Sequence, residues 1–475
     1  MVSVGLMALA LCIQSCSPSR QIGQFAEKEL AGQPGVASGQ VGISIYDPAQ
    51  AKFLYDRQGD KYFIPASNTK LFSLYAGLKY LGDSLVGMRY QENDTALFVE
   101  PSGDPSFLHH DYARQPVIDV LRASGKNIYI TDANWRDKPL GRGWAWDDFS
   151  DDYMPERSAF PVYGNYISWI HDSASESFYS IPDIDWGVRF DPDSTKKDFD
   201  VQRDHHANIF TITEGKGKYK EIDVPFITEG VESAARLLKD TVGRTVYTRR
   251  FMPAIATGPR SGSTPSNAPL NSAAPASSGN SSHDPSGFSS LAGSDPLASR
   301  ARLRVIHSQP VDSLFRPMMH RSDNFFAEQT LLMASNEHLG YMNDAKIIDT
   351  LLKSDLKDLP QKPYWVDGSG LSRNDLFTPR DFIWLLNKLQ QEFGLPRLKN
   401  ILPTGGTGTL GNYYKKDSGF IFAKTGSLSG VVALSGYLIT KKDHLLLFSI
   451  LVNNNSDPVV RRKIEKFIEM IREKY

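Results

Sequence analysis

Cysteine is nearly absent from this chain of 475 residues, and both copies, Cys12 and Cys16, lie within its first sixteen residues. Once that segment is removed, the remaining body has no thiol that could form a disulfide, bind zinc or attack a substrate. The composition therefore excludes cysteine-based catalysis and zinc–cysteine sites.

An excess of charge of either sign is also absent. The chain carries 53 lysines and arginines against 54 aspartates and glutamates, for a formal net charge of −1. Nucleic acids and acidic lipid surfaces attract proteins with a strong positive field, which this balance does not supply. We therefore expect no nucleic-acid partner.

A long hydrophobic run is missing as well. The longest apolar stretch near the start, Val4 to Ile13, is shorter than the roughly 20 residues that span a bilayer, but it suits the central region of a signal peptide. The residues before Cys16 resemble a loose lipobox, in which the cysteine is acylated. We expect residues 1–16 to be a signal peptide and the protein to be exported to the periplasm or cell envelope, with Cys16 as its sole membrane anchor. A plain cleaved signal and a buried N-terminal segment are the alternatives.

The remainder alternates between strand and helix patterns. Two strands joined by a polar turn are expected within 42–63, followed by a helix from Pro65, where leucines recur every three or four residues up to Leu81. The C-terminal part predicts several further elements: helices over 326–334, 344–356 and 381–393, strands over 431–440 and 444–452, and a closing helix over 457–475.

Strands at both ends with helices between them predict one α/β domain, an α+β sandwich, interrupted by an insertion. We assign residues 21–95 and 301–475 to this domain and 96–256 to an inserted β-rich region with short runs and many turns. Residues 257–300 consist largely of Ser, Gly, Pro, Ala and Asn, so they bury too little apolar surface to offset the entropy of ordering. This segment should be a disordered loop, either a species-specific surface loop or a partner-binding tail.

The first candidate catalytic pair is Ser67 and Lys70, in the stretch PASNTKLFS at the head of the predicted helix. Three residues on a helix bring two side chains together, so a lysine with a lowered pKa could take the serine proton. The positive end of the helix would favour an oxyanion nearby. An ordinary helix start with a solvated lysine is the alternative, and only further partners can decide between the two.

Two further motifs follow in the right order. Ser322 and Asn324 form a Ser-x-Asn triplet before a helix pattern, and Lys424, Thr425 and Gly426 form a Lys-Thr-Gly triplet on a predicted strand that is followed by a turn. Ser-x-x-Lys, Ser-x-Asn and Lys-Thr-Gly in this order are the signature of the penicillin-binding proteins and serine β-lactamases.

With its long gap between Lys70 and Ser322, the chain resembles the D-alanyl-D-alanine carboxypeptidase/endopeptidases of peptidase family S13, the large low-molecular-mass penicillin-binding proteins. Five more stretches carry the resemblance: SGDPS from Ser102, GWAWDD from Gly143, DGSGLSR from Asp367, LPTGGTGTL from Leu402 and VNNN from Val452. The resemblance implies a β-lactamase/DD-peptidase-like domain, peptidoglycan stem peptides as substrates, β-lactams as inhibitors, and neither a cofactor nor a metal.

The resemblance also implies roles. Ser67 would be the nucleophile and Lys70 its general base, while Ser322 would relay a proton to the departing amine. Asn324 would hold the substrate amide and Lys70. Lys424 would supply positive potential, and with Thr425 it would bind the terminal carboxylate.

Two backbone features complete these expectations. Gly426 would let the substrate backbone approach the strand, and the N–H groups of Ser67 and Ser427 would form the oxyanion hole. A serine β-lactamase and a non-catalytic wall-binding protein with the same fold are the alternatives.

Three other patterns have simpler interpretations. Gly406, Gly408 and Gly411 match G-x-G-x-x-G without the strand and acidic residue of a dinucleotide site, so we expect a turn beside the active site. The pairs His109–His110 and His205–His206 lack metal-site spacing and should be surface or loop residues. Trp144 and Trp146 could share one face that is open to a ligand or, more commonly, be buried under a loop.

Overall fold

The computed structural model describes residues 18–172, 177–191, 199–213, 220–253 and 303–475. The predicted signal peptide with Cys16 and the predicted loop 257–300 both lie outside the described residues. No helix among the described residues is long and apolar enough to cross a membrane.

The described α-helices and strands lie in the following ranges. The helices are α2 (Pro18–Ala26), α3 (Lys70–Tyr80), α4 (Pro116–Ala123), α5 (Glu232–Val242), α7 (Val311–His320), α8 (Asn324–Leu339), α9 (Asp344–Lys353), α10 (Pro379–Phe393), α11 (Leu395–Ile401) and α12 (Val460–Lys474). The strands are β1 (Gln40–Asp47), β2 (Lys52–Arg57), β3 (Ser84–Glu92), β4 (Ala96–Pro101), β5 (Asn127–Thr131), β6 (Tyr166–Asp172), β7 (Ser177–Ile181), β8 (Gly187–Asp191), β9 (Asp200–Arg203), β10 (Ile209–Thr213), β11 (Lys220–Pro225), β12 (Val246–Arg249), β13 (Arg304–Pro310), β14 (Ile421–Leu428), β15 (Val431–Ile439) and β16 (Leu445–Asn453). Short helical turns are the π-helix η1 (Glu27–Ala31) and the 3₁₀ turns η2 (Ala66–Thr69), η3 (Trp146–Asp148), η4 (Tyr163–Asn165), η5 (Gly408–Leu410) and η6 (Lys415–Asp417).

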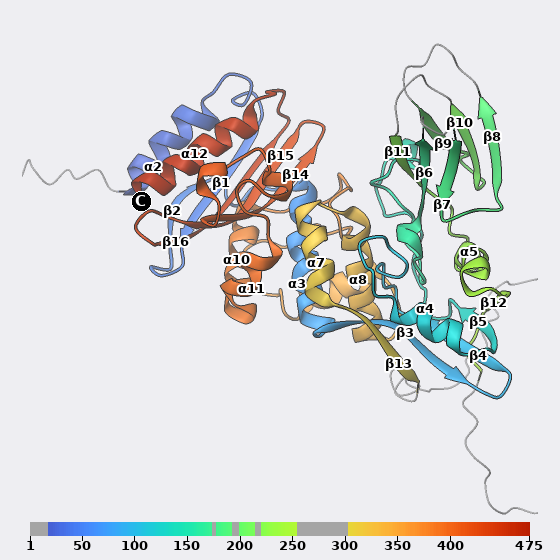
Figure 1. The fold of residues 1–475 in the computed structure, drawn as a ribbon. Helices are drawn as coiled ribbons and strands as arrows, with labels where there is room; N and C mark the ends of the chain where they lie inside the picture. The colour runs from blue at the N-terminus through green and yellow to red at the C-terminus, as the bar shows by residue number, and fades with distance from the viewer. Residues whose placement is uncertain (1–17, 173–176, 192–198, 214–219, 254–302) are drawn as a thin grey trace, which may run out of the picture.

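The two ends of the chain meet in one antiparallel sheet with the order β14-β15-β16-β1-β2. Strand β1 pairs with β16 in a register that sets Ile43 opposite Ile450, which confirms the α/β domain predicted from strands at both ends. Helices α2 and α12 cover one face of this sheet, and α10 lies on the other (Figure 1). The sheet is therefore buried on both faces, which explains its nearly continuous apolar strands.

Helices α3 and α8 pack against each other in the middle of the molecule. Helix α8 is buried all round from Phe325 to Asn336, so its polar residues have no access to water. A buried charge on such a helix requires a partner, because an unpaired ion is costly outside water. Glu328, which is fully buried on α8, is one such charge.

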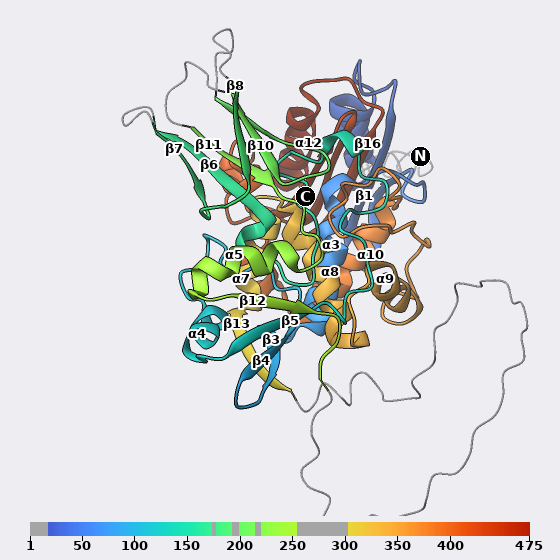
Figure 2. The same cartoon turned by 90° about the vertical axis from the view of Figure 1, so that its right-hand side faces the viewer.

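A second five-stranded sheet has the order β12-β5-β4-β3-β13 (Figure 2). Strands β3 and β13, which we assigned to the peptidase domain, therefore pair within the sheet of the inserted region. The border placed at 95/96 would cut the β3–β4 hairpin. We propose instead that the insertion extends from β3 to β13.

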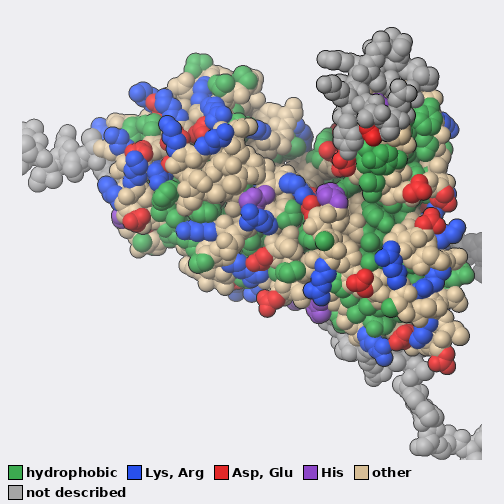
Figure 3. Space-filling model, in the orientation of Figure 1, with side chains coloured by type: hydrophobic (Ala, Val, Ile, Leu, Met, Phe, Trp, Pro, Cys, Tyr) green, Lys and Arg blue, Asp and Glu red, His purple; other side chains and the backbone are tan. Residues whose placement is uncertain are grey.

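Two three-stranded sheets, β8-β10-β9 and β11-β6-β7, lie further out in the inserted region. Figure 3 shows the surface hollowed between these sheets and the tip of the β14–β15 hairpin. The inserted region therefore faces the end of the hairpin whose first strand carries Lys424, Thr425 and Gly426.

Candidate functional site

The nucleophile candidate Ser67 lies in the 3₁₀ turn η2, and Lys70 is the first residue of α3. The predicted helix from Pro65 is thus a tight turn that continues into an α-helix. Ala66 has a φ of 48°, in the left-handed region that non-glycine residues adopt at a cost and that occurs often at functional sites. The turn aims Ser67 toward the neighbouring strand β14.

Lys70 is fully buried, and its ammonium group has three oxygen partners. Nζ lies 2.9 Å from Ser67 Oγ, 2.6 Å from Asn324 Oδ1 and 2.8 Å from the carbonyl oxygen of Ser369. Burial lowers the pKa of Lys70 to about 8, although nearby carboxylates, Asp367 first, partly oppose this shift. Near neutral pH a usable fraction of this amine is therefore unprotonated beside the serine.

The second motif approaches from α8. Ser322 has a φ of 64°, and Asp323 caps the helix by accepting a hydrogen bond of 2.9 Å from the backbone N–H of Phe326. Asn324 follows as the first residue of α8, and its Nδ2 donates to the carbonyl of Tyr153 in the inserted region at 2.9 Å. The asparagine therefore links Lys70 to the inserted region.

The third motif occupies the strand β14, as predicted. Lys424 is fully buried, and its Nζ donates to Ser322 Oγ at 2.8 Å and to the carbonyl of Thr425 at 2.7 Å. Burial, followed by the charge of Lys70, holds the pKa of Lys424 well below its usual value. The two lysines thus disfavour each other's protonation.

Gly426 is needed for packing within the protein. A Cβ at this position would lie 2.6 Å from the carbonyl oxygen of Pro65, so only glycine lets the strand approach the turn that carries Ser67. The expected approach of substrate to this strand stays a prediction.

A cavity of about 310 Å³ opens in front of the three motifs. Its lining includes Ser67, Ser322, Thr425, Gly426 and Ser427 from the motifs, together with Thr409, Leu410, Tyr413, Tyr414, Val432, Ala433, Leu434, Arg461 and Ile464. Thr409 and Leu410 belong to the predicted glycine-rich turn, which therefore lies beside the site as expected. All eight predicted site residues meet in one place, and Lys70, Asn324 and Lys424 connect its walls.

Sequence reasoning missed several residues that hold this arrangement. The loop DGSGLSR was noted, but nothing indicated that the Ser369 carbonyl would reach Lys70, because a backbone oxygen has no sequence signature. Asn453 of VNNN exchanges two hydrogen bonds with the backbone of Ile64, of 2.7 Å and 3.0 Å, and so fixes the approach to the nucleophile turn. Arg461 donates to Ser427 Oγ from α12.

The histidines and tryptophans differ in environment. His205 and His206 are exposed, whereas His109 is buried and its pKa is lowered to about 4 by burial. Within the described residues, ligand atoms of His109, His110 and Asp111 come within 4.8 Å of one another, but Arg321 already pairs with Asp111 at 2.6 Å. We keep the prediction of no metal.

The two tryptophans separate. Trp144 is partly buried and donates from Nε1 to Asp367 at 3.0 Å, while Trp146 is 75% exposed. The structure thus gives each ring a different environment: Trp144 supports the loop beside Lys70, and Trp146 faces solvent.

Comparison with known proteins identifies the family of this chain. The model of the D-Ala-D-Ala carboxypeptidase 3 (S13) family matches residues 26–197 and 291–475. A D-alanyl-D-alanine carboxypeptidase of an Actinomadura species is 27% identical over 458 residues, covering 90% of this chain and 80% of that protein.

Solved structures show the same fold. Penicillin binding protein 4 of Haemophilus influenzae superposes with a TM-score of 0.67 at 17% identity, covering 95% of this chain and 99% of that one. Its complex with a β-lactam gives a TM-score of 0.62 at 16% identity, covering 95% and 100%. Since the family model matches well over half of the chain, including the first part of the inserted region, the protein belongs to the D-Ala-D-Ala carboxypeptidase S13 family.

Proposed function

We propose that the protein is a serine peptidase that cleaves the D-alanyl-D-alanine bond of peptidoglycan stem peptides through an acyl-enzyme on Ser67. The observation that carries the proposal is the contact of 2.9 Å between Lys70 Nζ and Ser67 Oγ, made by a buried lysine whose pKa falls to about 8. A serine hydroxyl needs an adjacent base to become a nucleophile, and this lysine fits that need.

In the acylation step, Ser67 Oγ attacks the carbonyl carbon of the penultimate D-alanine while its proton passes to the neutral Lys70. The backbone N–H groups of Ser67 and Ser427 bind the resulting oxyanion. When the C–N bond breaks, Ser322 Oγ gives its proton to the leaving amine and takes one from Lys424, to which it is hydrogen-bonded at 2.8 Å. Water then hydrolyses the ester: its oxygen bonds to the acyl carbon, its proton returns to Lys424 through Ser322, and the proton on Lys70 returns to Ser67 Oγ as the C–O bond breaks.

Lys424 has a second role at the substrate carboxylate, which it binds together with Thr425. Burial and the charge of Lys70 both oppose its protonation, so it is charged most readily while Lys70 is neutral or while an anionic substrate lies in the cavity. The pair therefore favours the protonation state in which one lysine is a base and the other a cation.

The leaving group decides between two activities of this site. A free D-alanine makes the reaction a carboxypeptidase reaction, and a cross-linked neighbouring stem makes it an endopeptidase reaction. We propose both, in an exported protein of the bacterial envelope that has a lipid anchor at Cys16. β-Lactams should acylate the same serine, as a β-lactam complex of the Haemophilus influenzae protein supports.

The proposal is tested with an N-acylated tripeptide that ends in D-Ala-D-Ala, by chiral analysis of released alanine. We expect D-alanine release by the wild type, none by Ser67→Ala, and none from a matched peptide ending in D-Ala-L-Ala. No release, together with rapid turnover of penicillin, would favour a β-lactamase. No release, no penicillin turnover and no acylation would indicate a non-catalytic wall-binding protein.

A further inference from the structure

The three oxygen partners of Lys70 have unequal tasks once the lysine is neutral. A neutral amine keeps two N–H groups and one lone pair. If Asn324 Oδ1 and the Ser369 carbonyl accept the two N–H groups, the lone pair points at the third partner, Ser67 Oγ. The position of the Ser369 carbonyl therefore sets the direction in which the base acts.

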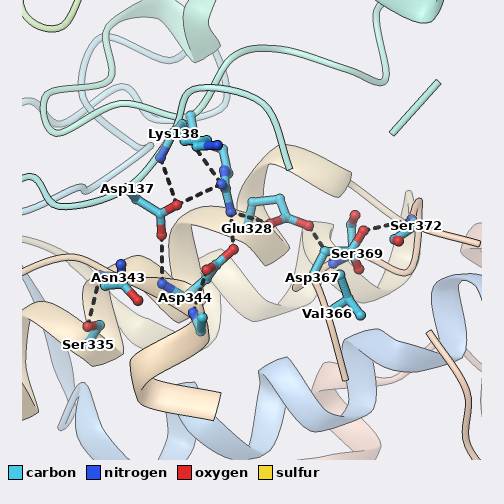
Figure 4. Close-up of polar contacts among 12 residues, drawn as sticks. Asp137, Lys138, Glu328, Ser335, Asn343, Asp344, Val366, Asp367, Ser369 and Ser372 are labelled. Carbon is cyan, nitrogen blue, oxygen red and sulfur yellow. Dashed lines mark hydrogen bonds and ion pairs between the residues drawn. The ribbon is translucent and has the colours of Figure 1, made fainter. Parts of the chain in front are cut away.

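The backbone of Ser369 is held by a side chain from α8. Its N–H donates to Glu328 Oε1 at 2.7 Å, while Asp367 accepts from the N–H groups of Gly370 and Ser372, both at 2.7 Å. Figure 4 shows Glu328 reaching from its helix toward Ser369. Glu328 lies four residues after Asn324, on the same face of α8. That face therefore positions both oxygens that accept the N–H groups of the neutral Lys70: Asn324 Oδ1 directly and the Ser369 carbonyl through Glu328.

The far side of Glu328 contacts the inserted region. Its Oε2 lies 3.3 Å from Nη1 of Arg157, which is 1% exposed and also pairs with Asp344 at 2.5 Å and with Asp137 at 3.1 Å. In Figure 4, Asp137 and Asp344 lie on the side of Glu328 that faces away from Ser369. Arg157 thus fixes Glu328 from behind.

We propose that Glu328 is a positioning residue for the general base: its Oε1, brought to the Ser369 N–H by the full length of the side chain, holds the Ser369 backbone so that the Ser369 carbonyl orients Lys70 toward Ser67. This inference rests on the proposed function. Its step is geometric, because Glu328 is not among the residues that line the cavity.

An alternative role for Glu328 would be its charge alone. The carboxylates of Asp367, Glu328, Asp323 and Asp375 all favour the ammonium form of Lys70. Burial, followed by the charge of Asp367, raises the pKa of Glu328 to about 7, so Glu328 supplies only part of a negative charge near neutral pH. The charge of Lys70 in turn opposes the protonation of Lys424. Reach and charge can be separated by substitution, since Glu328→Gln keeps the length and one acceptor, whereas Glu328→Asp keeps the charge and is one methylene shorter.

The test measures the saturating rate constant of acylation by a fluorescent penicillin, together with the concentration that gives half of this rate. Wild type, Glu328→Gln, Glu328→Asp and Glu337→Gln are compared well below the lowest of their unfolding temperatures. Glu337 is the matched control, because it pairs with Arg89 from the same helix α8 at 2.5 Å but has no contact with the Lys70 network.

We expect Glu328→Asp to reduce the saturating rate by about 10- to 100-fold, since small misplacements of reacting groups have effects of this size. The rate of Glu328→Gln should fall by less than about 5-fold, the half-saturating concentration should change little, and Glu337→Gln should change stability alone.

Equal rates in all four proteins, or a faster Asp than Gln variant, would overturn the inference. If the Asp variant does not fold, the Gln variant decides, because a loss below about 5-fold supports positioning by reach and a larger loss contradicts it. A wild type that is not acylated at all would overturn the proposed function itself.

Discussion

At the level of single residues, the proposed mechanism depends on the protonation of Lys70. The lysine loses hydration on burial and is stabilised as an ammonium only in part by neighbouring carboxylates, so its pKa is lowered to about 8. A group with a lowered pKa is neutral above that value, which is the form that the mechanism requires.

The acylation rate should therefore rise with pH. Below about pH 8 the neutral fraction of Lys70 grows roughly tenfold for each pH unit, and above it the rate should level off. Measuring the rate constant of penicillin acylation from pH 5.5 to 9.5 checks this expectation. Lys70→Arg, which cannot deprotonate, should abolish the rising limb along with the activity. A wild-type rate that stays flat between pH 6 and 8 would contradict a neutral lysine base.

At the level of single elements, the loop that carries Ser369 packs in direct backbone contact with the nucleophile turn. Gly370 has a φ of +78°, and a Cβ there would lie 1.9 Å from the carbonyl oxygen of Ala66. Any side chain at position 370 would strain the backbone and clash with a backbone atom. Only glycine therefore fits at this contact between the loop and the turn.

Gly370→Ala should lower the free energy of unfolding by at least about 2 kcal/mol and also slow acylation, because it displaces the residue before Ser67. Gly82→Ala is the control: its φ is +70°, with nothing within 4 Å of the added Cβ. This variant should lose only about 1 kcal/mol and keep its acylation rate. Denaturant unfolding and penicillin acylation check both values, and equal behaviour of the two variants would refute the close-packing argument.

Much at this scale could be predicted from local sequence. Leucine spacing marked α3, alternation marked β1 and β2, and the Ser-x-x-Lys and Lys-Thr-Gly motifs marked the two elements that carry them. Helix and strand ends were less certain: the last helix was expected from residue 457 and begins at Val460, and the helix over 344–356 ends at Lys353. End positions depend on caps and tertiary contacts rather than on periodicity.

At the scale of the whole molecule, long-range pairing was the harder part. Strands at both ends predicted one interrupted domain, but neither the pairing of β1 with β16 nor that of β13 with β3 could be predicted. No local pattern distinguishes a strand of the insertion from one of the main sheet. Glu328 and Arg157 were missed for the same reason, since they are 171 positions apart and neither belongs to a motif.

Arg157 joins the inserted region to α8 and α9, so its loss should lower the stability of the whole fold. Arg157→Met would leave the buried carboxylates of Glu328, Asp137 and Asp344 without their cation, which should cost about 3–5 kcal/mol of unfolding free energy. Arg236→Met removes a pair with Asp185 in which both side chains are at least half exposed, so it should change stability very little. Thermal and denaturant unfolding measure the difference, and similar losses in both variants would contradict the role given to Arg157.

The central claim is that the three motifs form one working acylation site on Ser67. The most direct measurement is intact-mass spectrometry of the protein mixed with benzylpenicillin, followed by peptide mapping, with Ser67→Ala alongside. We expect one stable penicilloyl adduct per chain, located on Ser67 and absent from the variant. An adduct on another residue, or none on a wild type that leaves the penicillin intact, would contradict it.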